Sequence, residues 1–221
     1  MNDYFSLLIE CLPSLLAGLK ITMIMAGASL ILAFIVGLIL AIFALSKIKI
    51  LEIFYTAYVY IVRGIPVMIF GLFLFFGVGA LLNIKCDPLR ARIVSLTINA
   101  SAYLAEIFRG GIKAVDVGQI EAARSLGLGY FRTMALVVIP QAVKIMIPPI
   151  INQFITTLKD TSILSVISVR ELTMNSQIII ARNYRPFEVY SYAAVMYLIV
   201  IVLLSILAKY VERSLQHGKN N

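Results

Sequence analysis

The chain has 221 residues, of which 61% are hydrophobic, and its mean hydropathy of +0.97 excludes an ordinary soluble domain. The net charge of +8 does not indicate a nucleic-acid partner, because the lysines and arginines stand at the ends of long apolar runs. No HExxH, CxxC, GxSxG or P-loop pattern occurs, and the single histidine, His217, cannot form a metal cluster or a hydrolytic triad. We therefore expect an all-α integral membrane protein without catalytic residues, metal ligands or a cofactor of its own.

The start of the chain predicts a surface helix followed by a first span. Apolar side chains recur at helical spacing over residues 1–16, which is typical of a helix lying in the membrane interface. The run Ile21–Leu45 holds 25 residues without a charge. A helix of that length crosses a hydrocarbon core of about 30 Å. The run is too long for a cleavable signal peptide, and no small-residue cleavage site follows it.

The second run, Ile53–Ile84, contains one charge, Arg63, and a proline, Pro66, which must interrupt a helix by removing a backbone donor. A charge in mid-bilayer costs about 2.5–3.5 kcal/mol, so Arg63 must face protein or water. Freed backbone groups are tolerated in a membrane only beside a cavity or inside protein. Two interpretations stay open for Arg63, Gly64 and Pro66: the break lines a transport pathway, or it only kinks the span.

Three further apolar runs bring the expected number of spans to five. They are Ile93–Ala105, which reaches span length only by continuing past Glu106, then Thr133–Leu158, interrupted by Lys144, and Val189–Ala208. Glu106 and Arg109 stand three residues apart on the third run and predict a local ion pair.

Five spans place the two termini on opposite sides of the membrane. With the N-terminus outside, nine lysines and arginines face inward and seven face outward, Arg92 among the seven. The positive-inside rule therefore favours an outer N-terminus and an inner C-terminus by a small margin. Cys11 and Cys86 then lie on the outer side, where we expect free thiols.

A polar segment of about residues 114–129 separates the third and fourth spans. Asp116 is placed to cap a short helix, and Gly127 and Gly129 supply the permissive backbone at which that helix would stop. Taken alone, such a segment is most simply a solvated connection between two spans.

Residues in and around this segment resemble the EAA motif of ABC importer permease subunits. The motif consists of Glu121-Ala122-Ala123, Gly127, and Val137-Val138-Ile139-Pro140, with conservative departures at Val137 and Ile139. The match extends to the polar amino-acid permeases through segments spread over nearly the whole chain. These are Arg63–Pro66, Asn99–Glu106, Arg109–Gly111, Gly118-Gln119 and Leu158–Ser162.

The resemblance implies one transmembrane domain over residues 1–221, with the five-helix fold of type I ABC importers, N-terminus outside and C-terminus inside. The segment 114–129 is then the cytoplasmic coupling helix, in which Glu121, Ala122, Ala123 and Gly127 serve contact with an ATPase. The expected partners are two ATPase subunits that hold ATP and Mg²⁺, a second and identical permease subunit, an extracytoplasmic amino-acid-binding protein and membrane lipid. The expected location is the bacterial inner membrane, as a multi-pass protein.

Polar side chains cluster where the fourth span is still deep in the membrane. At about 100° per residue, Gln153, Thr157 and Asp160 form one stripe of a helix, and Asn99 lies on a polar face of the third span. We expect these four to line a substrate cavity; hydrogen bonding between helices is the alternative. Asp160 is the only acid in the cluster. It therefore favours a polar, basic L-amino acid such as arginine, lysine or histidine, or glutamine, over glutamate.

Two other functions fit the sequence less well. A secondary transporter or channel working alone would need an ion-coupling site within one chain, and no inverted repeat is visible in the sequence. A non-transporting scaffold would leave the polar stripe of the fourth span without a role. We therefore expect a non-enzymatic permease subunit of an ATP-driven amino-acid importer.

Overall fold

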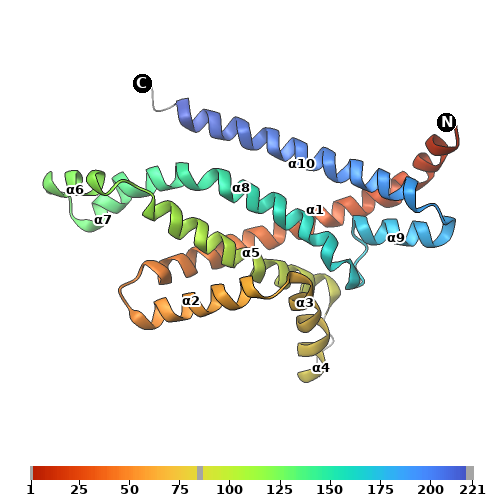
Figure 1. The fold of residues 1–221 in the computed structure, drawn as a ribbon, viewed down its shortest axis with the longest axis horizontal. Coiled ribbons are helices and arrows are strands. Elements are labelled where there is room, and N and C mark those ends of the chain that lie inside the picture. The colour runs from red at the N-terminus through yellow and green to blue at the C-terminus, as the bar shows by residue number, and fades with distance from the viewer. Residues whose placement is uncertain (1, 84–86, 218–221) are drawn as a thin grey trace.

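The computed structural model describes residues 2–83 and 87–217, with side chains for residues 4–83 and 87–213. Every regular element in these ranges is helical. Five long helices run lengthwise through the molecule (Figure 1). They are α1 (Asn2–Leu45), α2 (Lys49–Gly64), α5 (Pro88–Lys113), α8 (Ile139–Ile163) and α10 (Pro186–His217).

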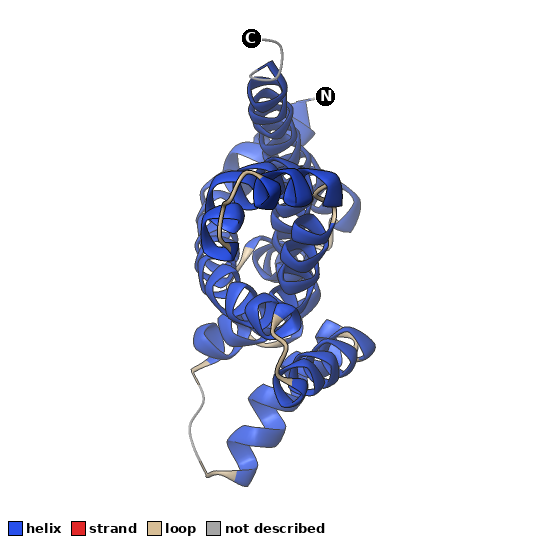
Figure 2. Cartoon of the chain, turned by 90° about the vertical axis from the view of Figure 1, so that its left-hand side faces the viewer, coloured by secondary structure: helices blue, strands red, loops and turns tan. Residues whose placement is uncertain are grey.

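Helix α5 occupies the centre of the bundle, because it packs against α1, α2 and α8 (Figure 1). Figure 2 views the same bundle of helices from the side on which α6 lies. The contact between α5 and α1 depends on a residue without a side chain. A Cβ atom on Gly37 would lie 2.9 Å from the Cβ of Leu104 and 3.1 Å from the carbonyl oxygen of Ser101. Small residues allow helices in lipid to approach closely in this way. The main apolar core lies along the same contact, around Ala33, Ala100 and Leu104.

Most of the long helices could cross a membrane by length and composition. Three stretches of the described residues qualify on their own, and the bent pair Lys49–Gly64 and Val67–Leu81 adds a fourth. They are Tyr4–Leu45, Tyr130–Val166 and Pro186–Arg213. Helix α5 is not among these stretches, and it carries five charged residues, Arg90, Arg92, Glu106, Arg109 and Lys113. Its central place removes much of its surface from lipid, so a polar helix can serve as the fifth span.

The first helix differs from the expected division into two parts. Residues 1–16 do not form a helix separate from the first span, since α1 continues from Asn2 to Leu45 with Pro13 inside it. Leu7, Cys11 and Leu15 pack against Leu172 and Ala193, so the early turns are fixed by protein contacts. Cys11 is a buried free thiol, as expected. Ile84 and Cys86 lie outside the described residues.

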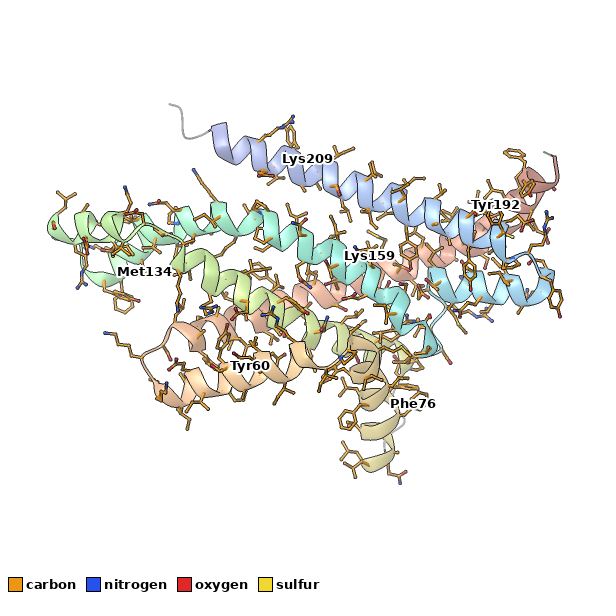
Figure 3. All side chains as sticks on the ribbon, in the orientation of Figure 1. Tyr60, Phe76, Met134, Lys159, Tyr192 and Lys209 are labelled. Carbon is orange, nitrogen blue, oxygen red and sulfur yellow. The ribbon has the colours of Figure 1, made fainter. Side chains whose placement is uncertain are left out.

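The second span is broken where the sequence predicts. Helix α2 ends at Gly64, Ile65 is extended, and the chain turns through 102° into the next helical stretch. That stretch consists of α3 (Val67–Leu72), a π-helical turn η1 (Phe73–Val78) and α4 (Gly79–Leu81). It stands across the other helices in Figure 1 and carries the exposed Phe76 labelled in Figure 3.

The short elements gather at the two ends of the bundle. At one end lie α6 (Val117–Ser125) and α7 (Tyr130–Thr133), from which the π-helical turn η2 (Met134–Val138) leads into α8. At the opposite end, the 3-10 turn η3 (Leu164–Val166) leads from α8 to α9 (Leu172–Asn183), as Figure 1 shows. We call these the α6 end and the α9 end.

Candidate functional site

The polar segment between α5 and α8 forms the short helix that its sequence predicts. The carboxylate of Asp116 accepts a hydrogen bond of 2.7 Å from the backbone N–H of Gly118 and so caps α6. At the other end, Gly127 has a φ of +84°, a left-handed conformation that residues with a Cβ adopt at a cost. Both ends of α6 are therefore set by the residues identified in the sequence.

The four residues assigned to ATPase contact do not share one environment. Glu121 and Ala122 are exposed, but Ala123 is only 5% exposed and faces its own chain. Ala123 therefore seats α6 against the bundle, and Gly127 provides the turn that ends it. The outer surface of α6 and α7 carries exposed apolar side chains that the sequence reasoning did not assign. They are Val117, Leu126, Tyr130 and Phe131, the last 86% exposed.

The polar stripe of α8 faces the interior of the protomer. Gln153 and Thr157 are 7% and 1% exposed, and the Gln153 amide nitrogen donates to the Thr157 hydroxyl at 3.3 Å. Asp160 continues the stripe and is half-buried. Asn152 and Thr156, on the neighbouring face, are exposed, and the Thr156 hydroxyl donates to the Asn152 carbonyl oxygen of its own helix. The buried and exposed faces of α8 thus follow the helical spacing.

The position of Asn99 relative to α8 is known only from the packing of their helices. It lies on α5, is 9% exposed, and α5 packs against α8. Within the described part of the chain, no hydrogen bond joins Asn99 to Gln153, Thr157 or Asp160. The structure therefore brings three of the four predicted substrate residues onto one helix face and leaves Asn99 on the adjoining helix.

The end of α8, just after Asp160, is held in place by hydrogen bonds from a buried arginine. Arg92, which the sequence placed among the outer cations, is fully buried and donates to the carbonyl oxygens of Thr161 and Val169. Nearby, the buried carboxylate of Glu171 caps α9 by accepting from the backbone N–H groups of Thr173 and Met174. The end of α8 is thereby tied to α5.

A groove of about 660 Å³ lies on another face, between α2 and α5 towards the α6 end. Arg63 and Gly64 from the helix break line it, together with Tyr103 and Glu106 from α5. Asn99, Gln153, Thr157 and Asp160 do not line it. In Figure 3, Tyr60 marks the α2 side of this groove, and Lys159 lies on α8. Gln153, Thr157 and Asp160 therefore lie apart from the groove, on α8, whereas helical spacing puts Asn99 on the same face of α5 as Tyr103 and Glu106.

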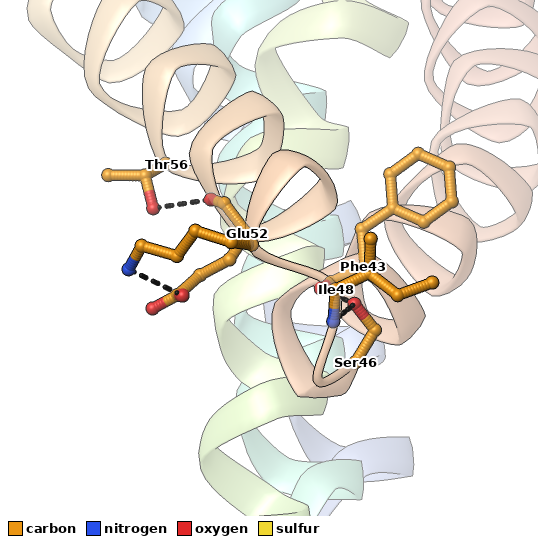
Figure 4. Close-up of polar contacts among 6 residues, drawn as sticks. Phe43, Ser46, Ile48, Glu52 and Thr56 are labelled. Carbon is orange, nitrogen blue, oxygen red and sulfur yellow. Dashed lines mark hydrogen bonds and ion pairs between the residues drawn. The ribbon is translucent and has the colours of Figure 1, made fainter.

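Both carboxylates that line this groove form ion pairs with residues of their own helices. The Glu106 carboxylate forms an ion pair with the Arg109 guanidinium, as their spacing predicts, with an N–O distance of 2.8 Å. The Arg109 Nε also donates a hydrogen bond of 3.1 Å to the Tyr55 hydroxyl. The second carboxylate, Glu52, is paired with Lys49 at 2.9 Å. In Figure 4 the Thr56 hydroxyl donates to the carbonyl oxygen of Glu52.

Residues 33–217 match the family described as binding-protein-dependent transport system inner membrane component. This chain belongs to that family. It is 40% identical to the "Probable glutamine ABC transporter permease protein GlnP" of Bacillus subtilis strain 168, over 92% of this chain and 94% of that protein. It is 33% identical to the arginine transport system permease protein ArtQ of the same strain, over 98% and 99%. A crystal structure of an amino acid ABC transporter with histidines superposes with a TM-score of 0.91 at 35% identity, over 96% and 98%.

Family membership confirms the main expectations from the sequence. The chain is a multi-pass permease subunit of the bacterial inner membrane, with the all-helical fold of type I ABC importer permeases. It is not catalytic, because ATP is hydrolysed by a separate subunit in such systems. An ATPase and a binding protein are the partners that the family implies.

Proposed function

We propose that this permease carries a polar L-amino acid, with a basic side chain preferred, across the inner membrane. The observation on which the proposal depends is the α8 stripe, in which the buried Gln153 and Thr157 lead to the half-buried Asp160. A carboxylate deep in a membrane needs a cation or water as a partner. No hydrogen bond or ion pair joins the Asp160 carboxylate to another described residue, so it is free to receive an ammonium or guanidinium group.

Glutamine is the second candidate substrate. The relative that is 40% identical over nearly the whole chain carries glutamine in its name, and the relative at 33% carries arginine. Gln153, Thr157 and Asn99 are neutral groups that both donate and accept hydrogen bonds, and these suit a carboxamide. The charge of Asp160 favours arginine, lysine and histidine over glutamine, and it disfavours glutamate.

The proposed assembly has two copies of this chain, two ATPase subunits with ATP and Mg²⁺, and an extracytoplasmic binding protein. We propose an outer N-terminus, so that α6 lies in the cytoplasm and contacts the ATPase through Glu121, Ala122 and the exposed apolar residues of α6 and α7. Closure of the ATPases then moves α6 and tilts the helices that follow it. The seated Ala123 and the continuous helical path from α7 into α8 support this transmission.

Reconstituted transport tests the proposal. The permease is purified together with the ATPase of the same organism and reconstituted into liposomes. The binding protein is added outside the liposomes, and ATP is enclosed within them. ATP-dependent uptake of labelled arginine, lysine, histidine or glutamine, and none of glutamate, is the expected result. Uptake driven by a proton or sodium gradient without the ATPase would instead support the secondary-transporter alternative. Uptake of glutamate equal to that of arginine would overturn the substrate proposal.

A further inference from the structure

The groove between α2 and α5 has an unusual composition for a membrane protein surface. It runs from Glu52, near the start of α2, to Arg63 and Gly64 at the helix break. At about 1.5 Å per residue, Arg63 lies roughly 20 Å along α2, well inside the hydrocarbon region. Charged side chains at that depth face water or protein, because lipid cannot solvate them. The groove is therefore covered by something other than lipid chains.

Arg63 is held in place without being neutralised. Its guanidinium carbon lies 4.9 Å from the centre of the Tyr103 ring, which is a cation–π contact. No carboxylate of the described residues lies within salt-bridge distance of Arg63, since Glu106 is taken by Arg109 and Glu52 by Lys49. The planar guanidinium therefore keeps its paired N–H donors for another acceptor, a geometry that matches a carboxylate.

Space for such an acceptor exists beside Arg63. A Cβ atom on Gly64 would meet nothing within 4 Å, and Thr56 and Tyr60 are exposed along the same wall. The groove has about 660 Å³, within the usual range of small-molecule sites. Lys113, towards the α6 end, is a second lining cation that has no carboxylate partner among the described residues. The unpaired charge of the groove is thus positive.

We propose that this groove is a second amino-acid station, separate from the α8 stripe, in which Arg63 binds the α-carboxylate of the passing substrate. The proposal rests on the proposed function, because it requires an amino acid to cross this subunit. The station lies between the helix break and the α6 end, which places it on the release side of the pathway if α6 is cytoplasmic. Tyr103 orients Arg63, and the engaged Glu106 and Glu52 do not compete for it.

Binding measurements with matched ligands test the carboxylate assignment. The detergent-purified complex of permease and ATPase, without binding protein, is titrated with arginine and glutamine and with their α-carboxamides, which lack the negative charge. The wild type should prefer each amino acid over its α-carboxamide by about tenfold or more, the effect of a charged hydrogen-bonded pair. Arg63→Gln should remove that preference, and Arg63→Lys should restore part of it. Arg90→Gln, the same change at an exposed site near the α9 end, should leave it intact.

The results separate this inference from the proposed function. If the wild type takes up amino acids and Arg63→Gln keeps the full preference for the carboxylate, the station is wrong and the proposed function stands. If the wild type neither binds nor takes up any amino acid, the station and the proposed function are both wrong.

Thiol labelling gives a readout that does not depend on transport. In a protein with Cys11 and Cys86 replaced by serine, Thr56→Cys places a thiol in the groove at the cost of one hydrogen bond within the helix. A charged thiol reagent should label it in lipid vesicles, and amino acid should slow the labelling. Ile35→Cys, on an exposed apolar face of α1, should stay unlabelled. An unlabelled Thr56→Cys would mean that lipid or the second copy covers the groove, and would overturn the station.

Discussion

Arg92 on α5 donates a hydrogen bond of 2.5 Å to the carbonyl oxygen of Thr161, the residue that follows Asp160 on α8. A second bond, of 3.1 Å, reaches the carbonyl oxygen of Val169 beyond the end of α8. One buried guanidinium thus fixes the last turn of α8 and the connection to α9. Arg92 thus holds Asp160 in register through the neighbouring residue, since no hydrogen bond or ion pair joins the described side chains of Arg92 and Asp160.

Replacing Arg92 should therefore shift the position of the Asp160 side chain, although Asp160 itself is not mutated. Arg92→Met removes two charged hydrogen bonds, each worth about 1.5–3 kcal/mol, and should lower the thermal midpoint of the purified permease by about 6–24 °C. Arg92→Lys keeps the charge but has a single donor nitrogen, so it cannot reproduce both bonds. It should fold, and the stabilisation of the protein by bound amino acid should be about tenfold weaker. Scanning fluorimetry with and without arginine measures both effects. Unchanged protection in Arg92→Lys would show that Arg92 only stabilises the fold.

The charge of Asp160 should decide which amino acids are carried. Asp160→Asn keeps the shape of the side chain and removes its charge. The affinity of uptake for arginine and lysine should fall by about ten- to a hundredfold. This is the effect of about 1.5–3 kcal/mol for a lost charged hydrogen bond. Uptake of glutamine should fall less. The matched control is Thr156→Ala on the exposed neighbouring face of α8. Equal losses for arginine and glutamine would mean that Asp160 supports structure and does not select substrate.

The two alanines of α6 should respond differently to a larger side chain. Ala122 is exposed, so Ala122→Trp should leave folding intact and block contact with the ATPase. Ala123 is 5% exposed, so Ala123→Leu should instead displace α6 from its own chain and lower the yield of folded protein. Co-purification of the ATPase and the thermal midpoint distinguish the two outcomes. If Ala122→Trp retains the ATPase and its stimulated activity, α6 does not dock through this face.

Local signals in the sequence predicted the local features of the structure. Pro66 breaks the second span and Asp116 caps α6, because each acts on backbone groups within a few residues. Features that need distant partners were not predictable in the same way. The burial of Arg92 depends on carbonyl oxygens at Thr161 and Val169, about 70 residues away, so its sequence neighbours indicated a surface cation.

The α2–α5 groove was also only partly predictable. Helical spacing puts Asn99, Tyr103 and Glu106 on one face of α5, and the sequence marks Arg63 beside the break, but nothing local set α2 against that face. The early turns of α1 were expected to be a separate interfacial helix for a similar reason. Their packing against Leu172 and Ala193 comes from the far end of the chain.

Gly127 offers the sharpest test of the turn that ends α6. Its φ of +84° is strained for a β-branched residue, so Gly127→Val should cost about 1–2 kcal/mol and redirect the chain between α6 and α7. Leu126, Tyr130 and Phe131 would then lose their places on the outer surface. We expect Gly127→Val to reach the membrane but to lose binding-protein-stimulated ATP hydrolysis. The matched control is Gly129→Ala, since Gly129 has a φ of −66° and open space around it, and its substitution should be neutral. Full stimulated hydrolysis in Gly127→Val would show that transmission does not depend on this turn, and equal loss in Gly129→Ala would show that the segment tolerates no side chain for reasons other than backbone strain.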